Sequence, residues 1–507
     1  MTMPTDMDLS GWIAGWADQT PAKTAIRDEQ GDLSYRDFAT RIEALAGALQ
    51  ARGIGTGDRV AHLGENTVKE LTLFFACARI GAMLVTLNWR LAPPEHLYQL
   101  QDAEPKLLFA DGMFFDHVAQ IRGDLSGMGF IGVDAEGEGW EAWPEGGPAC
   151  TLPSPGYDAP VLLVYTSGTT GKPKGAVLTQ GNVFWNAVNS QHAHDMTSDD
   201  VILGNLPLFH VGGLNNQLTP ALHCGATVLL HRRFEPGVTL AAIQRDRPTL
   251  ALAVPAMMQA LTEHPDWPTT DISSLRFVMA GSTTVPVALI QRFHDRGVPV
   301  GQIYGSTETA PLAVVLRRPD ALDHAGSCGK PAIHVSAKIV GRDGNELGNG
   351  ETGELLVRGP NVFSGYWRNP EATEAAFAEG WFRMGDVARR DADGFHYIED
   401  RAKDVIISGG ENVYPAELEQ ILAAEADLAE FAVVGRPDPR WDEVPVIVAV
   451  PREGQALDEA ALLGLFEGRV ARFKQPRAVI GIDALPRNAL GKVLKFELRD
   501  WLKEQAS

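Results

Sequence analysis

The segment YTSGTTGKPKG (residues 165–175) directly follows the apolar run PVLLV (residues 160–164). Glycine lets a backbone approach a ligand closely, and main-chain N–H groups, hydroxyls and lysines are the groups that bind phosphate. A continuous apolar run of this length is typical of a strand covered on both faces. The segment therefore predicts a phosphate-binding loop after a buried strand of an α/β fold. A flexible surface loop is the weaker interpretation, because the donor groups are so dense.

This loop differs from the phosphate loop of the common nucleoside triphosphatases. That motif requires Gly-Lys followed directly by Ser or Thr, whose hydroxyl binds magnesium. Here Pro173 follows Gly171 and Lys172, and no other Gly-Lys pair in the chain precedes Ser or Thr. The sequence therefore excludes a P-loop enzyme, and any magnesium ligand has to come from another segment.

The length and composition indicate a globular protein of more than one domain. At 507 residues, the chain suggests about three domains, or two if one is a large α/β domain. It is 45% hydrophobic and 21% charged, which is usual for a protein with a large core. The formal net charge of −21 argues against a nucleic-acid partner, which needs a basic surface. ATP can still bind, because local lysines and N–H groups suffice.

The cysteines and the start of the chain favour a cytoplasmic protein. Cys77, Cys150, Cys224 and Cys328 are far apart and form no CxxC pair, so neither a zinc site nor a disulfide framework is expected. The first residues lack the basic and apolar regions of a signal peptide. Residues 201–230 carry no Asp, Glu, Lys or Arg, but prolines and amides interrupt them, so no transmembrane segment is expected.

The pattern of predicted helices and strands changes twice along the chain. Strand-like and helical segments alternate until about residue 310, which predicts layered α/β structure. Residues 336–399 show short apolar runs between Gly/Asp turns, as in a β-meander. A second boundary lies near residues 400–404, and a compact α+β segment follows it. We therefore expect an N-terminal domain over residues 1–400, with a β-rich subdomain, and a small C-terminal domain over residues 401–507.

Several motifs together resemble the adenylate-forming superfamily, which includes acyl-CoA synthetases, adenylation domains of peptide synthetases and luciferases. The opening loop resembles its signature, and YGSTE (residues 304–308) its second core motif. GELLVRGPNVFSGYW and GWFRMGD resemble the third, and DRAKDVIISGGENVYPAELE the start of the mobile C-terminal domain. PRNALGKVLK resembles the catalytic-lysine motif of that domain. The resemblance extends from about residue 10 to 500 and implies an α/β enzyme that makes acyl-CoA.

The reaction that this resemblance implies begins with attack of a carboxylate on the α-phosphorus of ATP, with release of pyrophosphate. Because both reactants are anionic, the transition state needs positive charge and N–H dipoles. The family places the threonine-rich loop against the β- and γ-phosphates. That assignment covers Thr166, Ser167, Gly168, Thr169, Thr170, Gly171 and Lys174.

The second core motif implies further contacts with ATP. Tyr304 beside Gly305 and Ser306 suits the face of adenine, and Thr307 can donate to the α-phosphate. Glu308 is the carboxylate expected to bind Mg²⁺, which prefers oxygen ligands. A solvated loop carboxylate is the alternative for Glu308. The segment AGSTT lines the adenine and acid pockets in the family, which assigns Gly281, Ser282 and Thr283.

The remaining motifs imply roles for residues near the domain border and in the C-terminal domain. Asp386 is expected to accept from the ribose hydroxyls, with a turn aspartate as the alternative. Arg401 is expected to contact ribose or phosphate, and Lys403 occupies the hinge position. Lys492 is the expected adenylation lysine, bridging the acid and the α-phosphate. Lys495 is the neighbour most easily confused with it.

Thioester formation is the implied second step, with coenzyme A as co-substrate. Ser408, Gly409 and Gly410 are expected to receive the pantetheine arm. The acyl-adenylate is already activated, so the thiol needs no nucleophilic residue from the enzyme. His210, in PLFHVGGLNN, resembles the histidine between the acid pocket and the thiol channel, although a purely structural histidine is the alternative.

The sequence leaves the acid itself open. Residues 209–216, 253–258, 280–284 and 309–314 are expected to line an apolar pocket. Phrases such as LNWRL and GYWRNPEAT most resemble medium- to long-chain fatty-acid ligases and their aryl-acid relatives. We expect a fatty acid first, with a cinnamate- or benzoate-like acid second. An amino acid is disfavoured, because residues 207–219 contain no aspartate to pair its ammonium. Luciferase chemistry and a non-catalytic nucleotide sensor are further alternatives, and a homodimer stays open.

Overall fold

The computed structural model describes residues 7–166, 173–281, 285–401, 404–408, 411–438, 441–467, 469–487 and 493–505. The chain divides into two compact units. The first comprises Met1–Ala337, Val357–Phe382 and Gly394–His396, and the second comprises Lys338–Leu356, Arg383–Asp393 and Tyr397–Ser507. The predicted domain boundary after residue 400 stays a prediction.

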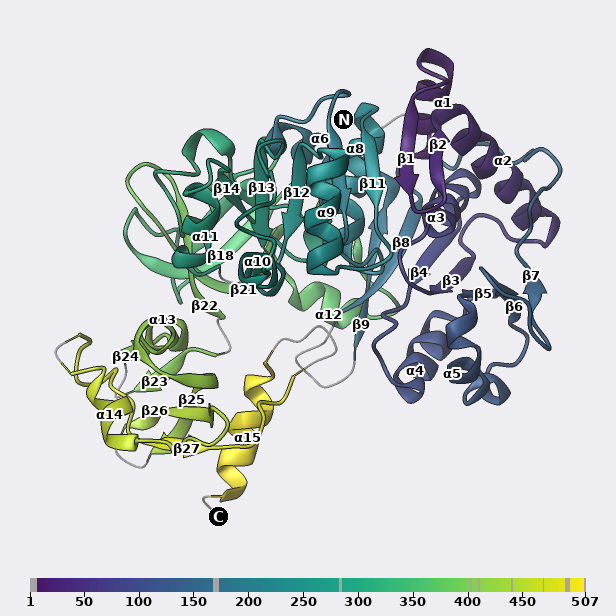
Figure 1. The fold of residues 1–507 in the computed structure, drawn as a ribbon. Coiled ribbons are helices and arrows are strands. Elements are labelled where there is room, and N and C mark those ends of the chain that lie inside the picture. The colour runs from purple at the N-terminus through teal and green to yellow at the C-terminus, as the bar shows by residue number, and fades with distance from the viewer. Residues whose placement is uncertain are drawn as a thin grey trace. The chain divides into compact units, whose positions relative to one another are not determined.

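The first unit contains a mainly parallel sheet of nine strands (Figure 1). Strands β1 and β10–β14 run parallel to their neighbours, whereas β2, β15 and β16 pair antiparallel at the edges. In sheet order, the strands are β16 (Lys330–Pro331), β15 (Val314–Leu316), β14 (Val300–Tyr304), β13 (Phe277–Gly281), β12 (Leu250–Ala253), β10 (Val201–Gly204), β11 (Thr227–Leu230), β1 (Thr24–Asp28) and β2 (Gly31–Ser34).

Helices cover both faces of this sheet. On one face lie α9 (Pro236–Asp246), α10 (Pro255–Glu263) and α11 (Val287–His294), which share a buried apolar core with the strands (Figure 1). On the other face, His194 of α6 (Gln180–His194) lies 6.5 Å from the ring of Phe277 on β13. Burial on both faces explains why these strands read as continuous apolar runs in the sequence.

A second sheet of eight strands completes the first unit. In order, its strands are β19 (Gly365–Tyr366), β9 (Lys174–Thr179), β8 (Pro160–Thr166), β4 (Met83–Thr86), β3 (Arg59–Leu63), β5 (Leu107–Ala110), β6 (Gly129–Gly132) and β7 (Glu141–Ala142). The run PVLLV forms β8, and residues 161–164 are buried as expected. Helix α3 (Val68–Ile80) begins where the Thr67 hydroxyl accepts from the Glu70 N–H and ends at Gly81, whose φ is +74°.

Smaller strands and helices fill the rest of the chain. Helices α1 (Ser10–Gln19), α2 (Tyr35–Ala51), α4 (Pro93–Ala103), α5 (Phe115–Ala119), α8 (Thr219–Cys224) and α12 (Pro370–Ala375) belong to the first unit. A further five-stranded sheet contains β17 (Ser336–Val340), β18 (Thr352–Arg358), β20 (Phe377–Ala378), β21 (Trp381–Arg390) and β22 (His396–Arg401). The predicted meander was too broad here, because residues 365–366 pair instead with β9 of the eight-stranded sheet.

The second unit contains a separate mixed sheet. It is built from β23 (Ile406–Ser408), β24 (Glu411–Val413), β25 (Leu428–Asp438), β26 (Asp442–Pro451) and β27 (Val479–Gly481). The helices of this unit are α13 (Pro415–Glu425), α14 (Glu459–Gly464) and α15 (Lys495–Gln505). The mixed α/β class, with a large unit and a smaller α+β unit, confirms the expected fold class.

Candidate active site

The carboxyl ends of the parallel strands in the nine-stranded sheet meet at one edge. Asn205 follows β10, Gly281 ends β13, and Tyr304 ends β14. Ligands of open α/β sheets bind in the crevice beyond these ends. The sequence-predicted residues 281 and 304–308 therefore lie at the edge where a ligand is expected.

The YGSTE segment leaves β14 in a tightly bonded turn. The Ser306 N–H donates to the Thr309 hydroxyl at 2.9 Å, and that hydroxyl donates to the Pro311 carbonyl at 2.8 Å. Asn361 fixes the same turn, since its side-chain amide donates at 2.7 Å to the carbonyls of Thr309 and Leu312. These bonds hold Thr307 and Glu308 in a short helical turn, Thr307–Thr309, with both side chains buried.

Gly305 is the position in this turn that cannot take a side chain. A Cβ atom there would lie 1.7 Å from the Pro311 carbonyl oxygen. We expect Gly305→Ala to lower the free energy of unfolding by about 1–3 kcal/mol, the usual cost of overpacking. Thermal unfolding checks this, with Gly15→Ala as control because a Cβ at Gly15 meets nothing within 4 Å. Equal unfolding temperatures for the two variants would contradict the expectation.

Glu308 contacts Tyr366, which is far away in the sequence and which also lies close to Lys174. Its Oε1 accepts a hydrogen bond from the Tyr366 hydroxyl at 2.8 Å. The Lys174 ammonium lies 5.3 Å from the centre of the Tyr366 ring, within cation–π range. Burial and the neighbouring carboxylate of Glu308 raise the pKa of Tyr366, so its phenol stays a donor at neutral pH. The structure thus brings together the predicted residues Lys174 and Glu308.

The base of the phosphate-binding loop is held by the β8–β9 hairpin. Thr166 pairs with Lys174 in the antiparallel register, and the Tyr98 hydroxyl donates to the Pro173 carbonyl at 3.3 Å. Tyr165 donates to Asp102 at 2.6 Å. The structure places Thr166 and Lys174. The other loop residues assigned to phosphate, Ser167, Gly168, Thr169, Thr170 and Gly171, lie outside the described residues.

His210 is half-buried and caps the start of a short helix. Its Nδ1 accepts a hydrogen bond from the Gly212 N–H at 2.9 Å, so the neutral ring carries its proton on Nε2. Burial, with a smaller contribution from the Arg90 guanidinium, lowers the pKa of His210 to about 4. The ring is therefore uncharged at physiological pH, which suits a positioning role better than that of a cation.

A π-helix, Leu214–Leu218, follows His210 and carries three consecutive buried amide side chains. Within the described residues, one polar atom of each lacks a hydrogen-bond partner: Asn215 Nδ2, Asn216 Oδ1 and Gln217 Oε1. π-Helical turns often occur at functional sites, and a buried unpaired polar atom costs about 1–3 kcal/mol. The turn therefore offers hydrogen bonds that the surrounding protein does not satisfy.

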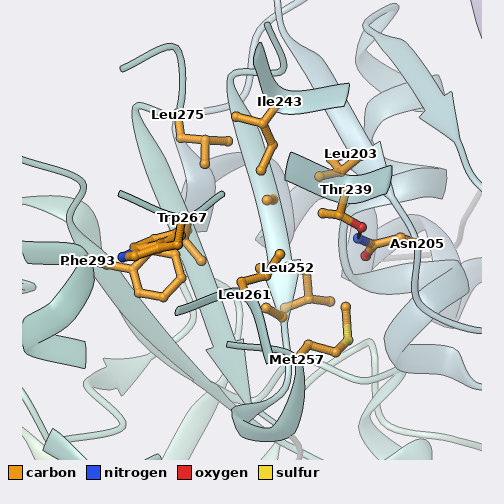
Figure 2. Close-up of a pocket in the computed structure, with 13 residues that line it drawn as sticks. Leu203, Asn205, Thr239, Ile243, Leu252, Met257, Leu261, Trp267, Leu275 and Phe293 are labelled. Atoms are coloured by element: carbon orange, nitrogen blue, oxygen red, sulfur yellow. Dashed lines mark hydrogen bonds between the residues drawn. The ribbon is translucent and has the colours of Figure 1, made fainter. Parts of the chain in front are cut away.

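An apolar cavity lies between the nine-stranded sheet and helices α9–α11 (Figure 2). Asn205 and Thr239 are its polar members; the Asn205 side-chain nitrogen lies 3.5 Å from the Thr239 hydroxyl. At another side, Trp267 and Phe293 pack edge to face, with ring centres 4.9 Å apart. Among the described residues of the predicted acid-pocket segments, only residues 253–258 contribute to its lining, through Ala253 and Met257.

Three of the predicted residues that the structure describes lie in the second unit. Asp386 is buried on β21 and Ser408 is buried on β23. Arg401 ends β22. The predicted residues Ser282, Thr283, Lys403, Gly409, Gly410 and Lys492 lie outside the described residues, so their roles stay predictions.

Sequence reasoning missed two residues of this site. Tyr366 bonds to Glu308, and Asn361 holds the turn that carries it. Both lie within the quoted motif GELLVRGPNVFSGYW, but the sequence alone gave them no role. Their location in a recognised motif was the available signal.

Comparison with known proteins agrees with this geometry. The family described as AMP-binding enzyme matches residues 13–367, and the AMP-binding enzyme C-terminal domain matches residues 417–492. An indoleacetate–CoA ligase of Aromatoleum aromaticum is 49% identical over 97% of this chain and 98% of its own. A long-chain-fatty-acid–CoA ligase, FadD13, of Mycobacterium tuberculosis is 34% identical over 92% of this chain and 93% of its own.

A solved structure extends the likeness to the fold. It is the O-succinylbenzoate coenzyme A synthetase of Bacillus subtilis in complex with ATP and magnesium ion, with a TM-score of 0.86 and 33% identity. The match covers 98% of this chain and 99% of that one. The chain belongs to the AMP-binding enzyme family, and its expected class, an acid–thiol ligase of the acyl-CoA synthetase type, is confirmed.

Neither a spanning helix nor a multi-residue metal cluster was found in the part of the chain that the structure describes. No helix there has the length and apolar character needed to cross a membrane. Among the same residues, no three His, Cys, Asp or Glu side chains gather to hold a metal. A single carboxylate such as Glu308 nevertheless fits Mg²⁺, which keeps water and substrate phosphate oxygens as its other ligands.

Proposed function

We propose that this chain is an ATP-dependent CoA ligase of aromatic carboxylic acids. It joins an aromatic acid to AMP, releases diphosphate, and then transfers the acyl group to the thiol of coenzyme A. The observation that carries the proposal is the 49% identity with an indoleacetate–CoA ligase over nearly the whole of both chains. The contact of Glu308 with Tyr366, beside Lys174, supplies the matching charges for a bound nucleotide.

The proposed adenylation step uses residues of the first unit to hold ATP. Lys174 and the loop from Thr166 onward bind the β- and γ-phosphates. Tyr304 and Gly281 meet the adenine, and Thr307 donates to the α-phosphate. Glu308 holds Mg²⁺, which, when bound, supplies charge that neutralises the phosphates. Neutral His210 orients the acid near its carboxylate.

The proposed roles of the C-terminal region follow from the sequence resemblance. Residues 401–507 form a domain that swings about Lys403. Lys492 brings its ammonium to the acid and the α-phosphate. Asp386 binds the ribose, and Arg401 contacts the ribose or a phosphate. In the second step, Ser408, Gly409 and Gly410 receive the pantetheine arm of coenzyme A.

The unsatisfied amides of the π-helix support an aromatic acid over an alkyl one. An alkyl chain against Asn215, Asn216 and Gln217 would leave their buried atoms unpaired. An indole N–H or a phenol O–H can instead donate to Asn216 Oδ1 or Gln217 Oε1. The motifs had favoured a fatty acid by resemblance, and the FadD13 relative keeps a fatty acid as the second candidate.

An acid panel tests the reaction and the substrate class together. Pyrophosphate release from ATP is measured with indoleacetate, hydroxycinnamate, an N-methyl indoleacetate, and medium- and long-chain fatty acids. We expect indoleacetate to have a kcat/KM about 10–100-fold above that of its N-methyl analogue, because the analogue leaves a buried acceptor unpaired. Coenzyme A should then release AMP and form the thioester.

The outcomes of this panel separate the candidates. Highest activity with a fatty acid would replace the aromatic proposal with the second candidate. Equal rates for indoleacetate and its N-methyl analogue would contradict the proposed hydrogen bond from the indole N–H to Asn216 or Gln217. If no acid of the panel elicited pyrophosphate release, the proposal that this chain catalyses the reaction would be refuted.

A further inference from the structure

Tyr366 occupies a place in the fold that fixes its backbone independently of any ligand. Strand β19 adds to the edge of the eight-stranded sheet, and Tyr366 lies opposite Ala176 of β9. The Tyr366 N–H donates to the Thr373 hydroxyl at 2.9 Å, and the Trp367 N–H donates to the Gly175 carbonyl at 2.7 Å. The strand therefore attaches directly to the segment that leaves the phosphate-binding loop.

Gly365 makes this attachment possible. Its φ is +143°, in a region that side chains rarely adopt, and a Cβ there would lie 2.8 Å from Thr373 Cγ2. The chain can thus turn closely past α12 before Tyr366. As a result, the Tyr366 backbone is fixed by pairing with β9 on one side and by the hydrogen bond to Thr373 of α12 on the other.

The side chain of Tyr366 joins two charges of opposite sign. Its hydroxyl donates to Glu308 Oε1 at 2.8 Å, and its ring centre lies 5.3 Å from the Lys174 ammonium. Phe363 fixes the main chain of Glu308, because the Phe363 N–H donates to the Glu308 carbonyl at 2.8 Å. The Phe363 ring also packs on the Tyr366 ring, at 4.9 Å and 73°.

We propose that Tyr366 is a positioning residue that couples the phosphate-binding loop to the metal-binding carboxylate. Its hydroxyl holds Glu308 in one rotamer, and its ring face holds the ammonium of Lys174. The inference rests on the proposed function, because it assigns Mg²⁺ to Glu308 and phosphate to Lys174.

The physical advantage lies in preparing both charges before ATP arrives. A glutamate side chain has several rotamers, and ordering it upon binding would reduce affinity. A hydrogen bond to an ionised carboxylate is about twice as strong as one between neutral groups, so it can hold the rotamer. The bond engages one oxygen of the carboxylate only, and a carboxylate has acceptor sites on both.

The test compares Tyr366→Phe with Tyr35→Phe. Tyr366→Phe keeps the ring, and therefore the contact with Lys174, and removes only the hydroxyl that bonds Glu308. Tyr35 is a matched control: it is fully buried and donates to the Ala226 carbonyl at 2.7 Å, at the amino end of β11, the opposite edge of the sheet from Tyr304. Both variants should have similar losses in unfolding temperature.

Binding of ATP by calorimetry at a series of Mg²⁺ concentrations is the direct readout, with acid omitted so that no turnover occurs. We expect Tyr366→Phe to raise the Mg²⁺ concentration for half-maximal tightening of ATP binding about tenfold, the loss expected for a charge-assisted bond. ATP binding in EDTA should be unchanged. Tyr35→Phe should match the wild type in both conditions.

A double-mutant cycle decides whether Tyr366 acts through Glu308. In a Glu308→Gln background, Tyr366→Phe should change the Mg²⁺ dependence less than twofold, because the charged partner is already gone. An equal effect in both backgrounds, or a loss of unfolding temperature without any change in Mg²⁺ dependence, would overturn the proposal. If no acid were turned over, altered Mg²⁺ dependence would still uphold the coupling, whereas the proposed enzymatic function would be refuted.

Discussion

Glu308→Gln is expected to lower the rate of pyrophosphate release by about 10²–10³-fold, the usual cost of removing one preorganised electrostatic group. The amide keeps the shape of the side chain, and its oxygen can still accept from Tyr366. What the variant loses is the negative charge that a magnesium ion requires. Glu308 is buried in a turn held by Asn361 and Phe363, so no other part of that turn can move in to replace it.

The measurement is steady-state pyrophosphate release at saturating ATP and acid, over a range of Mg²⁺ concentrations. Glu308→Asp serves as the matched control: it keeps the charge and shortens the side chain by one methylene, so raised Mg²⁺ should recover part of its rate. Raised Mg²⁺ should not recover Glu308→Gln. A Gln variant with wild-type activity, or with full recovery at high Mg²⁺, would contradict the assignment of the metal to this residue.

Much of the fold could be predicted because its strands are buried on both faces. The run PVLLV became β8, and residues 68–80 form α3 between the Thr67 cap and Gly81. Such elements report their structure locally, through apolar spacing and cap residues. The position of β19 could not be read in this way, since two residues carry no periodicity and their partner strand lies far away in the sequence.

Site residues that belong to sequence motifs could be predicted. Those whose role depends on contacts between distant parts of the chain could not. Lys174 and Glu308 followed from motifs, but their meeting depends on Tyr366, which reaches Glu308 across 58 positions of the chain. The π-helix of residues 214–218 has a similar origin. Whether Asn216 and Gln217 keep unpaired atoms depends on packing against neighbouring elements, and no local pattern records that.

The cavity beside α9–α11 could also be predicted only in part from the sequence. The sequence placed residues 253–258 near the acid, and Ala253 and Met257 do line an apolar space. Its remaining walls come from strands, helices and the segment after α10, including Trp267 and Phe293, whose sequences gave no sign of a cavity. Apolar residues identify a core, whereas the space left between them depends on how the side chains pack.

Lys492→Ala is expected to lower adenylation at least ~100-fold while largely sparing thioester formation from supplied acyl-adenylate. The ammonium offsets charge only while two anions, the acid and ATP, approach each other. Once the adenylate exists, the thiol attacks an activated acyl phosphate anhydride and that need is gone. The two half-reactions should therefore separate, which no loss of fold would produce.

Lys495 provides the matched control for this lysine. Its ammonium forms an ion pair with Glu419 at 2.8 Å, and the same Glu419 carboxylate accepts from the Val433 N–H at 2.8 Å. Lys495 is thus engaged within the second unit, so Lys495→Ala should lower the unfolding temperature slightly and reduce both half-reactions by the same small factor. Each variant is measured by pyrophosphate release and, separately, by thioester formation from synthetic acyl-adenylate. If Lys492→Ala depressed the two half-reactions equally, or if Lys495→Ala selectively abolished adenylation, the assignment of the catalytic lysine would have to be reversed.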